Sequence, residues 1–231
     1  MIKHVIFDCY GTLINTGKGS IEAVKAILAN VGSDVPAEDF YAHWKRIKKH
    51  MMDTDEFVTE KKFFELSLKE TFAKFGITAD ATVEVKPMID SLFSRRNIFD
   101  EVKPMLEGLA AMGFTYAIGS TTDTDSIMCH LNQNELTVPL VFTSEDMKVY
   151  KPKADFYRTI LNQTGWDVSE CVFVGDNYVD DVLGPKSIGM KAVLLDRNNK
   201  FNEADCEIQP DYIVSNLLEL IDILEVANGQ R

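Results

Sequence analysis

The stretch KHVIFDCYGTL, residues 3–13, is an apolar run that stops on a carboxylate and then turns. Residues 5–7 predict a buried strand, and Asp8 follows directly at its carboxyl end. Open α/β sheets place their ligands at this edge, so Asp8 stands where a nucleophile or a metal ligand would be needed. Taken alone, the residue would more simply cap the next helix.

Three further polar signals follow in the later apolar segments of the chain. One apolar run leads into Ser120 and its neighbours, and Lys151 precedes a proline at the start of a helix-like segment. Another apolar run leads into GDNYVDD at residues 175–181. The carboxyl ends of parallel strands share one edge of a sheet, so we expect Asp8, Lys151 and Asp176 to meet in one crevice.

In this order the four signals resemble the motifs of the haloacid dehalogenase-like (HAD) hydrolase superfamily. Those motifs are a nucleophilic Asp after the first strand, a Ser or Thr, a Lys and an acidic pair. The resemblance runs from Ile2 to about Arg197. It implies an enzyme, a hydrolase with an aspartate nucleophile, built on a Rossmann-like α/β core.

The spacing of the apolar runs also predicts a doubly wound parallel sheet, because helix-length segments separate them. The strand-like runs cover residues 5–8, 116–120, 140–143, 172–176, 192–196 and 212–214. Residues of about 15–96 show helical spacing, many aromatic residues and no clear strand. In the HAD family an insertion here is a helical cap over the site. We therefore expect a core of residues 1–14 and 97–231 and a cap of residues 15–96.

The resemblance also implies roles for individual catalytic residues. Asp8 would be the nucleophile, and Ser120 would donate a hydroxyl hydrogen bond to an oxygen of the substrate. Lys151 would reach the nucleophile and the negative charge that develops on the substrate. Tyr10 lies beside them in the first motif.

A magnesium site follows from the same motifs. Asp8, Asp176 and the backbone carbonyl of Tyr10 match the family's magnesium ligands, and Asp181 is the further acid of the fourth motif. Clustered carboxylates repel one another unless a cation compensates them, and hard oxygen ligands suit Mg²⁺. Mg²⁺ is therefore the expected cofactor.

Five residues are expected to contact the substrate. Thr12 and Thr121 offer a hydroxyl or a backbone N–H near the site. Lys45 and Arg46 follow a tryptophan, which resembles the Trp-Arg pair of the dehalogenase cap. Asn177 matches the fourth motif of the dehalogenase branch.

Tyr10 departs from the phosphatase pattern, because most phosphatases of the superfamily carry a second Asp at this position as acid and base. A phenol with an ordinary pKa near ~10 is a poor substitute for that carboxylate. The form Asp-x-Tyr-Gly-Thr instead looks like the L-2-haloacid dehalogenases, in which halide departs without a proton. Those enzymes work without metal and lack the acid that stands here at Asp176.

Three functions therefore remain open. The sequence most strongly predicts Mg²⁺-dependent, phosphatase-type hydrolysis of a small phosphorylated metabolite. The first alternative is an L-2-haloacid dehalogenase that displaces halide without metal. The second is a HAD fold with weak or lost catalysis that acts as a ligand-binding protein.

Composition narrows the partners. The formal net charge is −12, from 36 acidic and 24 basic residues, which disfavours nucleic acid and anionic membrane surfaces. No apolar run approaches the ~18 residues of a membrane span, and the N-terminus lacks the pattern of a signal peptide. We therefore expect a cytoplasmic protein with a small anionic substrate and reduced cysteines, and a homodimer remains open.

Overall fold

The computed structural model describes residues 1–52, 56–202 and 206–229. One sheet of six parallel strands has the order β3-β2-β1-β4-β5-β6, so the chain winds outward from β1 in both directions. This confirms the doubly wound α/β prediction. The strands are β1 His4–Phe7, β2 Thr115–Ser120, β3 Val141–Thr143, β4 Cys171–Gly175, β5 Lys191–Leu195 and β6 Tyr212–Val214.

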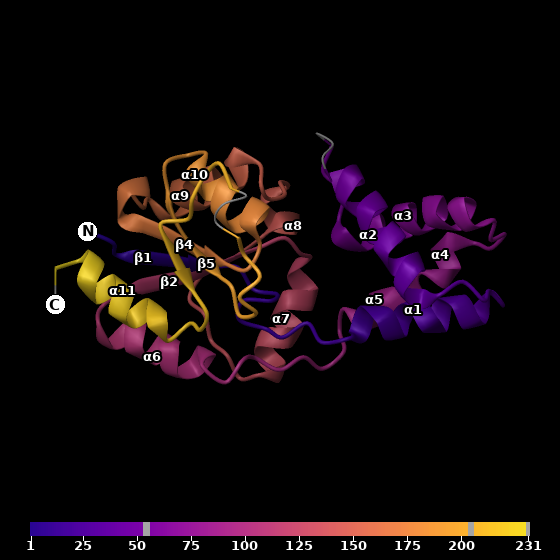
Figure 1. Cartoon of the computed structure of the whole chain (residues 1–231), viewed down its shortest axis with the longest axis horizontal. Helices are drawn as coiled ribbons and strands as arrows, with labels where there is room; N and C mark the ends of the chain where they lie inside the picture. Colours follow the sequence, from indigo (N-terminus) through magenta and orange to yellow (C-terminus); the bar gives the residue numbers. More distant parts are fainter. Residues whose placement is uncertain (53–55, 203–205, 230–231) are drawn as a thin grey trace.

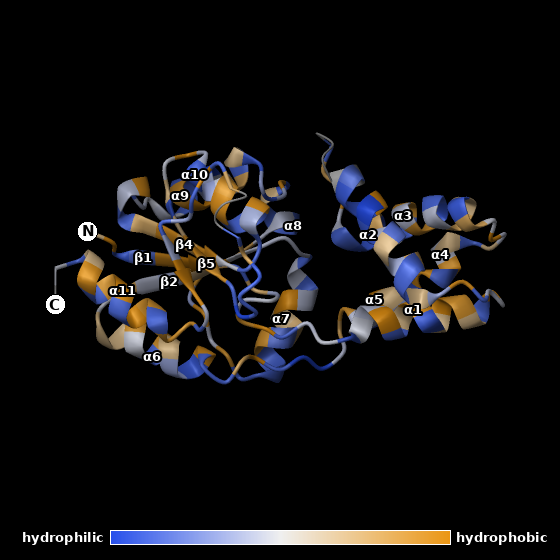
Figure 2. Ribbon diagram, in the orientation of Figure 1, coloured by the Kyte–Doolittle hydropathy of each residue, from blue (hydrophilic) through white to orange (hydrophobic). Residues whose placement is uncertain are grey.

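Helices cover both faces of the sheet (Figure 1). The side chains of a strand alternate between faces, so Val5 and Phe7 pack into one hydrophobic cluster while Ile6 packs into another. One face carries α6 Val102–Ala111, α7 Thr124–Gln133 and α11 Glu219–Ala227, and the other carries α9 Ala154–Thr164. Figure 2 shows the apolar strands enclosed between amphipathic helices. Buried on both faces, the strands read as continuous apolar runs.

The described part of the inserted unit contains five helices, and the unit lies beyond the carboxyl edge of the sheet (Figure 1). They are α1 Gly19–Asn30, α2 Ala37–Met52, α3 Glu60–Phe75, α4 Ala81–Glu84 and α5 Lys86–Ser91. The unit has its own hydrophobic cluster, in which Phe40, Leu68 and Trp44 are almost fully buried. The indole N–H of Trp44 donates to the Ser67 hydroxyl at 2.7 Å, so the one polar atom of this side chain is satisfied inside the cap.

Two segments connect the cap to the core, and they run side by side. The Asn15 N–H donates to the Asn97 carbonyl at 2.9 Å, and Ile14 forms a β-bridge with Ile98. We therefore propose the division expected from the sequence, a core of residues 1–14 and 97–231 and a cap of residues 15–96.

Four short elements complete the described part of the core. They are α8 Ser144–Met147, the 3₁₀ turn η1 Val168–Glu170, the π-helical turn η2 Tyr178–Leu183 and α10 Gly184–Lys186. Within the described ranges, no helix has both the length and the apolar character needed to cross a membrane.

Candidate active site

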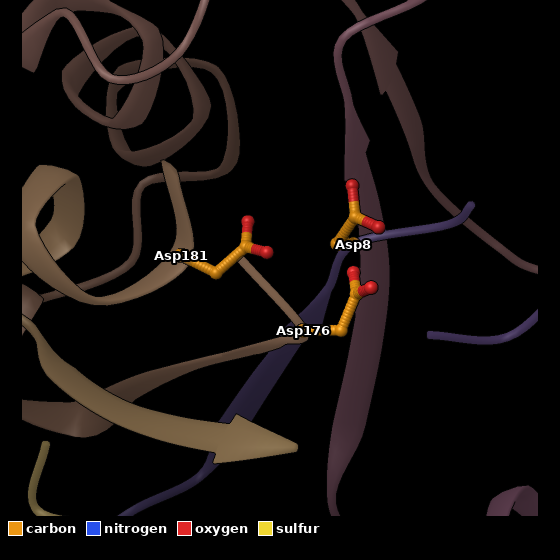
Figure 3. Close-up of side chains that lie close together, drawn as sticks. All are labelled: Asp8, Asp176 and Asp181. Atoms are coloured by element: carbon orange, nitrogen blue, oxygen red, sulfur yellow. The ribbon is translucent and has the colours of Figure 1, made fainter. Parts of the chain in front are cut away.

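Three carboxylates gather at the carboxyl edge of the sheet (Figure 3). Asp8 follows β1 and Asp176 follows β4, and the two strands pair in parallel with Phe7 opposite Val174. Asp181 reaches the same point from η2. Carboxylate oxygens of the three residues lie within 4.8 Å of one another. The register of β1 and β4 therefore sets the first two carboxylates side by side.

Lys151 joins this cluster as its buried cation. Its ammonium lies 2.8 Å from Asp8 Oδ1 and 2.8 Å from Asp181 Oδ1. Burial by itself lowers the pKa of Lys151, but the Asp181 and Asp8 carboxylates outweigh it and hold the pKa above its ordinary value. The other oxygen of Asp181 accepts the Asn177 N–H at 2.9 Å. Both Asp181 oxygens thus accept hydrogen bonds from protein donors.

Two glycines allow the backbone to approach the carboxylates this closely. Gly11 has φ +97°, and a Cβ placed there would lie 2.3 Å from Asp176 Oδ2. A Cβ on Gly175 would lie 2.2 Å from the Asp181 carboxyl carbon. Any larger residue at either position would displace an acidic side chain.

The charges and donor atoms of the cluster fit a divalent cation such as Mg²⁺. Three carboxylates and one ammonium leave two uncompensated negative charges when all are ionised. Burial and the Asp8 carboxylate raise the pKa of Asp176 to about 6. Burial raises the pKa of Asp181 to about 7 against the opposing effect of Lys151. A bound cation that prefers hard oxygen ligands would therefore reduce the electrostatic repulsion among these carboxylates.

Two residues expected to contact substrate have side chains that hydrogen-bond within the acidic loop. The Thr12 hydroxyl donates to Asp176 Oδ1 at 3.4 Å. The Asn177 side-chain carbonyl accepts the N–H groups of Val179 and Asp180 at 3.0 and 3.1 Å, which caps η2. Their contacts place both residues among the groups that position the cluster.

A cavity of about 440 Å³ lies between the cap and the core, and the first-motif residue Tyr10 lines it. Ser120 ends β2 and is buried, and the next residue, Thr121, lines the cavity. The Thr121 hydroxyl is buried and has no hydrogen-bond partner among the described residues. An oxygen of a bound anion would satisfy that donor.

The cavity is lined by more basic than acidic side chains, although the chain as a whole is acidic. Lys18, Lys45, Lys48 and Arg96 line it, and Glu60 is the acidic residue among the described residues that do so. An anionic ligand is the expected occupant of such a basic recess.

The two basic cap residues suggested by the sequence separate in the structure. Lys45 lines the cavity, whereas Arg46 is exposed, lies 3.4 Å from His43 Nδ1 and does not line it. Sequence reasoning missed Lys48 and Arg96. Lys48 lies three residues after Lys45 on α2, so helical periodicity could have indicated it, but Arg96 in the second connection carries no comparable signal.

Tyr10 has a partner that the sequence did not indicate. Its hydroxyl lies 2.8 Å from Nδ1 of His130, which is fully buried on α7. The other ring nitrogen of His130 lies 3.0 Å from the Ser94 carbonyl, which can only accept. Burial lowers the pKa of His130, which favours the neutral ring. In the neutral ring Nε2 carries the one N–H, which it donates to the Ser94 carbonyl, and the Tyr10 hydroxyl donates to Nδ1. The phenol is tied to the segment that connects cap and core.

The cap also docks on the core through the start of α3. The buried Asp123 of the core accepts the N–H groups of Glu60 and Lys61 at 2.7 and 3.1 Å. Its carboxylate therefore satisfies free N–H groups at the N-terminus of α3, a helix of the inserted unit. The Glu60 side chain pairs with Lys48 at 2.5 Å and accepts the Thr122 hydroxyl at 3.1 Å. These contacts hold the cap over the carboxyl edge of the sheet.

A doubly wound parallel sheet with a carboxylate cluster at its carboxyl edge and an inserted helical unit is the architecture of a class of hydrolases with a Rossmann-like core. Residues 2–189 match the model of the haloacid dehalogenase-like hydrolases, and the chain belongs to this family. The resemblance expected from the sequence is thereby confirmed.

The chain is similar in sequence to a phosphatase and in fold to two solved structures, one of them a dehalogenase. The chain is 27% identical over 237 residues to the glyceraldehyde 3-phosphate phosphatase of Methanocaldococcus jannaschii, covering 97% of this chain and 98% of that one. The magnesium-bound HAD-hydrolase YfnB of Bacillus subtilis has a TM-score of 0.80 at 17% identity, covering 97% and 99%. The L-2-haloacid dehalogenase of Xanthobacter autotrophicus has a TM-score of 0.77 at 20% identity, with the same coverage. The two structures share the fold of this chain.

Proposed function

We propose that this hydrolase is a Mg²⁺-dependent phosphatase acting on small phosphorylated metabolites. The observation that carries the proposal is the position of Asp176. One of its carboxylate oxygens lies within 4.8 Å of carboxylate oxygens of Asp8 and Asp181. Displacement of halide from carbon needs no such ligand, whereas a phosphoryl group brings negative charge that a cation must offset. The phosphatase relative, similar over almost its whole length, supports this choice.

In the proposed mechanism Asp8 is the nucleophile. Lys151 orients the Asp8 carboxylate through its 2.8 Å contact and neutralises charge on the incoming phosphoryl group. Ser120 and Thr121 donate hydrogen bonds to the phosphoryl oxygens. Mg²⁺, held by Asp8, Asp176 and the Tyr10 carbonyl, would supply electrostatic stabilisation of those oxygens.

The substrate is proposed to be a small anion. The cavity of about 440 Å³ suits a metabolite of modest size, and its lining includes Lys45, Lys48 and Arg96. These cations lie on the cap side, where they would contact the part of the substrate that is not transferred. Specificity would then come from α2 and the second connection.

Dehalogenation of a 2-haloacid is the second candidate, and Tyr10 favours it. The phenol offers no carboxyl group for proton transfer, and halide departs without one. Lys45 would bind the substrate carboxylate as a single charge, because it lacks the bidentate fork of an arginine.

A paired screen of phosphorylated metabolites and short-chain 2-haloacids, with Mg²⁺ and with a chelator, separates the candidates. We expect phosphate release that needs Mg²⁺ and is lost in Asp8→Asn and Asp176→Asn. Asp155→Asn, a change at an exposed carboxylate on α9, is the matched control and should retain activity. Halide release without metal would select the dehalogenase, and no turnover of either class would reject both.

A further inference from the structure

A departing oxygen could take a proton only from an acidic group near the cavity, and the Tyr10 hydroxyl already has a hydrogen-bond acceptor within the protein. The Tyr10 hydroxyl donates a hydrogen bond to His130 Nδ1, and in the neutral ring that nitrogen carries no hydrogen, because the one ring N–H is at Nε2 and donates to the Ser94 carbonyl. The hydroxyl hydrogen is therefore directed at α7 and away from a bound substrate.

Glu60 and Lys151 are also held in hydrogen bonds within the protein. The Glu60 carboxylate accepts from Lys48 at 2.5 Å and from the Thr122 hydroxyl at 3.1 Å, so each of its two oxygens already has a donor within the protein. The Lys151 ammonium is buried and bound by Asp8 and Asp181. Neither side chain is placed to protonate a departing oxygen. Asp176, which the proposed function assigns to Mg²⁺, would bind that ion as a carboxylate and would have no proton to donate.

The remaining polar side chains of the cavity belong to poor classes of acid. Among the described lining residues they are lysines, an arginine, a second phenol and alcohols. Such groups ordinarily hold their protons well above neutral pH. They stabilise a departing anion by charge or hydrogen bonding, but they are inefficient as general acids near neutrality.

We propose that the leaving group departs as a stable anion without receiving a proton from the enzyme, and that the substrates are acyl phosphates or phosphoanhydrides. Their leaving groups are a carboxylate or a phosphate, which need no proton and which the basic side chains Lys45, Lys48 and Arg96 attract. This inference rests on the proposed phosphatase function and narrows its substrate class.

The reaction balances without an enzyme acid. An Asp8 carboxylate oxygen attacks phosphorus, the bond to the leaving oxygen breaks, and the electron pair leaves with that oxygen as an anion. The aspartyl phosphate formed is then attacked at phosphorus by water. The Asp8 oxygen–phosphorus bond breaks, one water proton moves to a phosphoryl oxygen, and the products are the Asp8 carboxylate and H₂PO₄⁻.

The test compares kcat/KM, with saturating Mg²⁺, for acetyl phosphate, pyrophosphate, 4-nitrophenyl phosphate and benzyl phosphate. The first three have acidic leaving groups, whereas benzyl alcohol is a weak acid whose departure calls for a proton. General acid catalysis contributes about 10²–10⁴-fold, so benzyl phosphate should react more slowly than 4-nitrophenyl phosphate by at least about 10²-fold.

A matched pair of variants tests whether the missing carboxyl group is the cause. Tyr10→Asp introduces a carboxyl group, and Tyr10→Asn makes the same change in size without one. We expect Tyr10→Asp to narrow the ratio between 4-nitrophenyl and benzyl phosphate relative to Tyr10→Asn. The ratio is internal to each variant, so a loss of stability common to both leaves the comparison intact.

The failures are distinguishable. Wild-type rates for benzyl and 4-nitrophenyl phosphate within about tenfold of each other would overturn the inference while leaving the phosphatase proposal in place. Equal ratios in Tyr10→Asp and Tyr10→Asn would also overturn it. Absence of Mg²⁺-dependent hydrolysis with all four probes would reject the phosphatase function itself, and the inference with it.

Discussion

Replacing Gly11 with alanine tests whether the close approach of this backbone to Asp176 shapes the site. Gly11 has φ +97°, so the substitution costs about 1–2 kcal/mol of backbone strain. The new Cβ would also lie 2.3 Å from Asp176 Oδ2, which adds about 1–3 kcal/mol of overpacking unless the carboxylate moves. If the carboxylate moves, a proposed metal ligand is displaced, and we expect at least about a 10²-fold loss of Mg²⁺ affinity and kcat/KM.

Gly165→Ala is the matched control. Gly165 ends α9 with φ +72°, but nothing lies within 4 Å of its ideal Cβ, so this variant carries the strain alone. Urea unfolding should show Gly11→Ala to be less stable than Gly165→Ala by about 1–3 kcal/mol, or equally stable if Asp176 has moved. Calorimetric titration with Mg²⁺ and steady-state kinetics should show a loss in Gly11→Ala only. Equal Mg²⁺ affinity and activity in the two variants would refute the reasoning.

Three further predictions follow from the charges. The raised pKa values of Asp176 and Asp181, about 6 and about 7 against 3.8, mean that the folded chain retains protons that the unfolded chain releases. Without metal, the urea midpoint of unfolding should therefore fall as pH rises from about 4 to 7. Saturating Mg²⁺ should remove this decline. A urea midpoint that does not change with pH in the absence of metal would contradict the prediction. Asp123→Ala should weaken docking of α3 by about 1 kcal/mol and speed hydrogen exchange in its first turn but not in β1, whereas unchanged exchange would count against the docking role. Lys45→Gln should raise KM for an anionic substrate several-fold, and this effect should be smaller at high salt. Lys62→Gln makes an equal change in charge at a lysine paired with Glu65 outside the cavity and should leave KM unchanged. Equal KM values for the two variants would argue against binding of the substrate by the basic cavity.

The sheet could be predicted because its central strands, such as β1 and β4, are buried on both faces and therefore stand out as apolar runs. The acidic residues could be placed because a parallel sheet brings the carboxyl ends of its strands to one edge, whatever the details of the loops. Asp8 and Asp176 follow strands that pair in register, so their proximity needed no knowledge of the cap. Even the strand ends agree with the sequence to within a residue or so.

The roles of single side chains were harder to predict, because they depend on partners far away in the sequence. Tyr10 meets His130 across 120 positions, and Glu60 meets Thr122 across 62. The sequence predicts that Asn177 contacts substrate. It does not indicate that the Asn177 side-chain carbonyl accepts the Val179 N–H and so caps η2, because this contact depends on the conformation of the local turn. Arg46 and Lys45 are neighbours in sequence, and only the orientation of α2 decides which one faces the cavity.

The hydrophobic cluster of the cap is closed on itself, and this has an evolutionary consequence. Its buried members all fall between Ala23 and Leu92, and none belongs to the clusters under the sheet. Mutations on the cavity side of α2 can therefore accumulate without disturbing the packing that aligns Asp8 with Lys151. Natural selection can retune what this protein recognises while the reacting groups stay fixed, and a transplanted cap would be the laboratory equivalent.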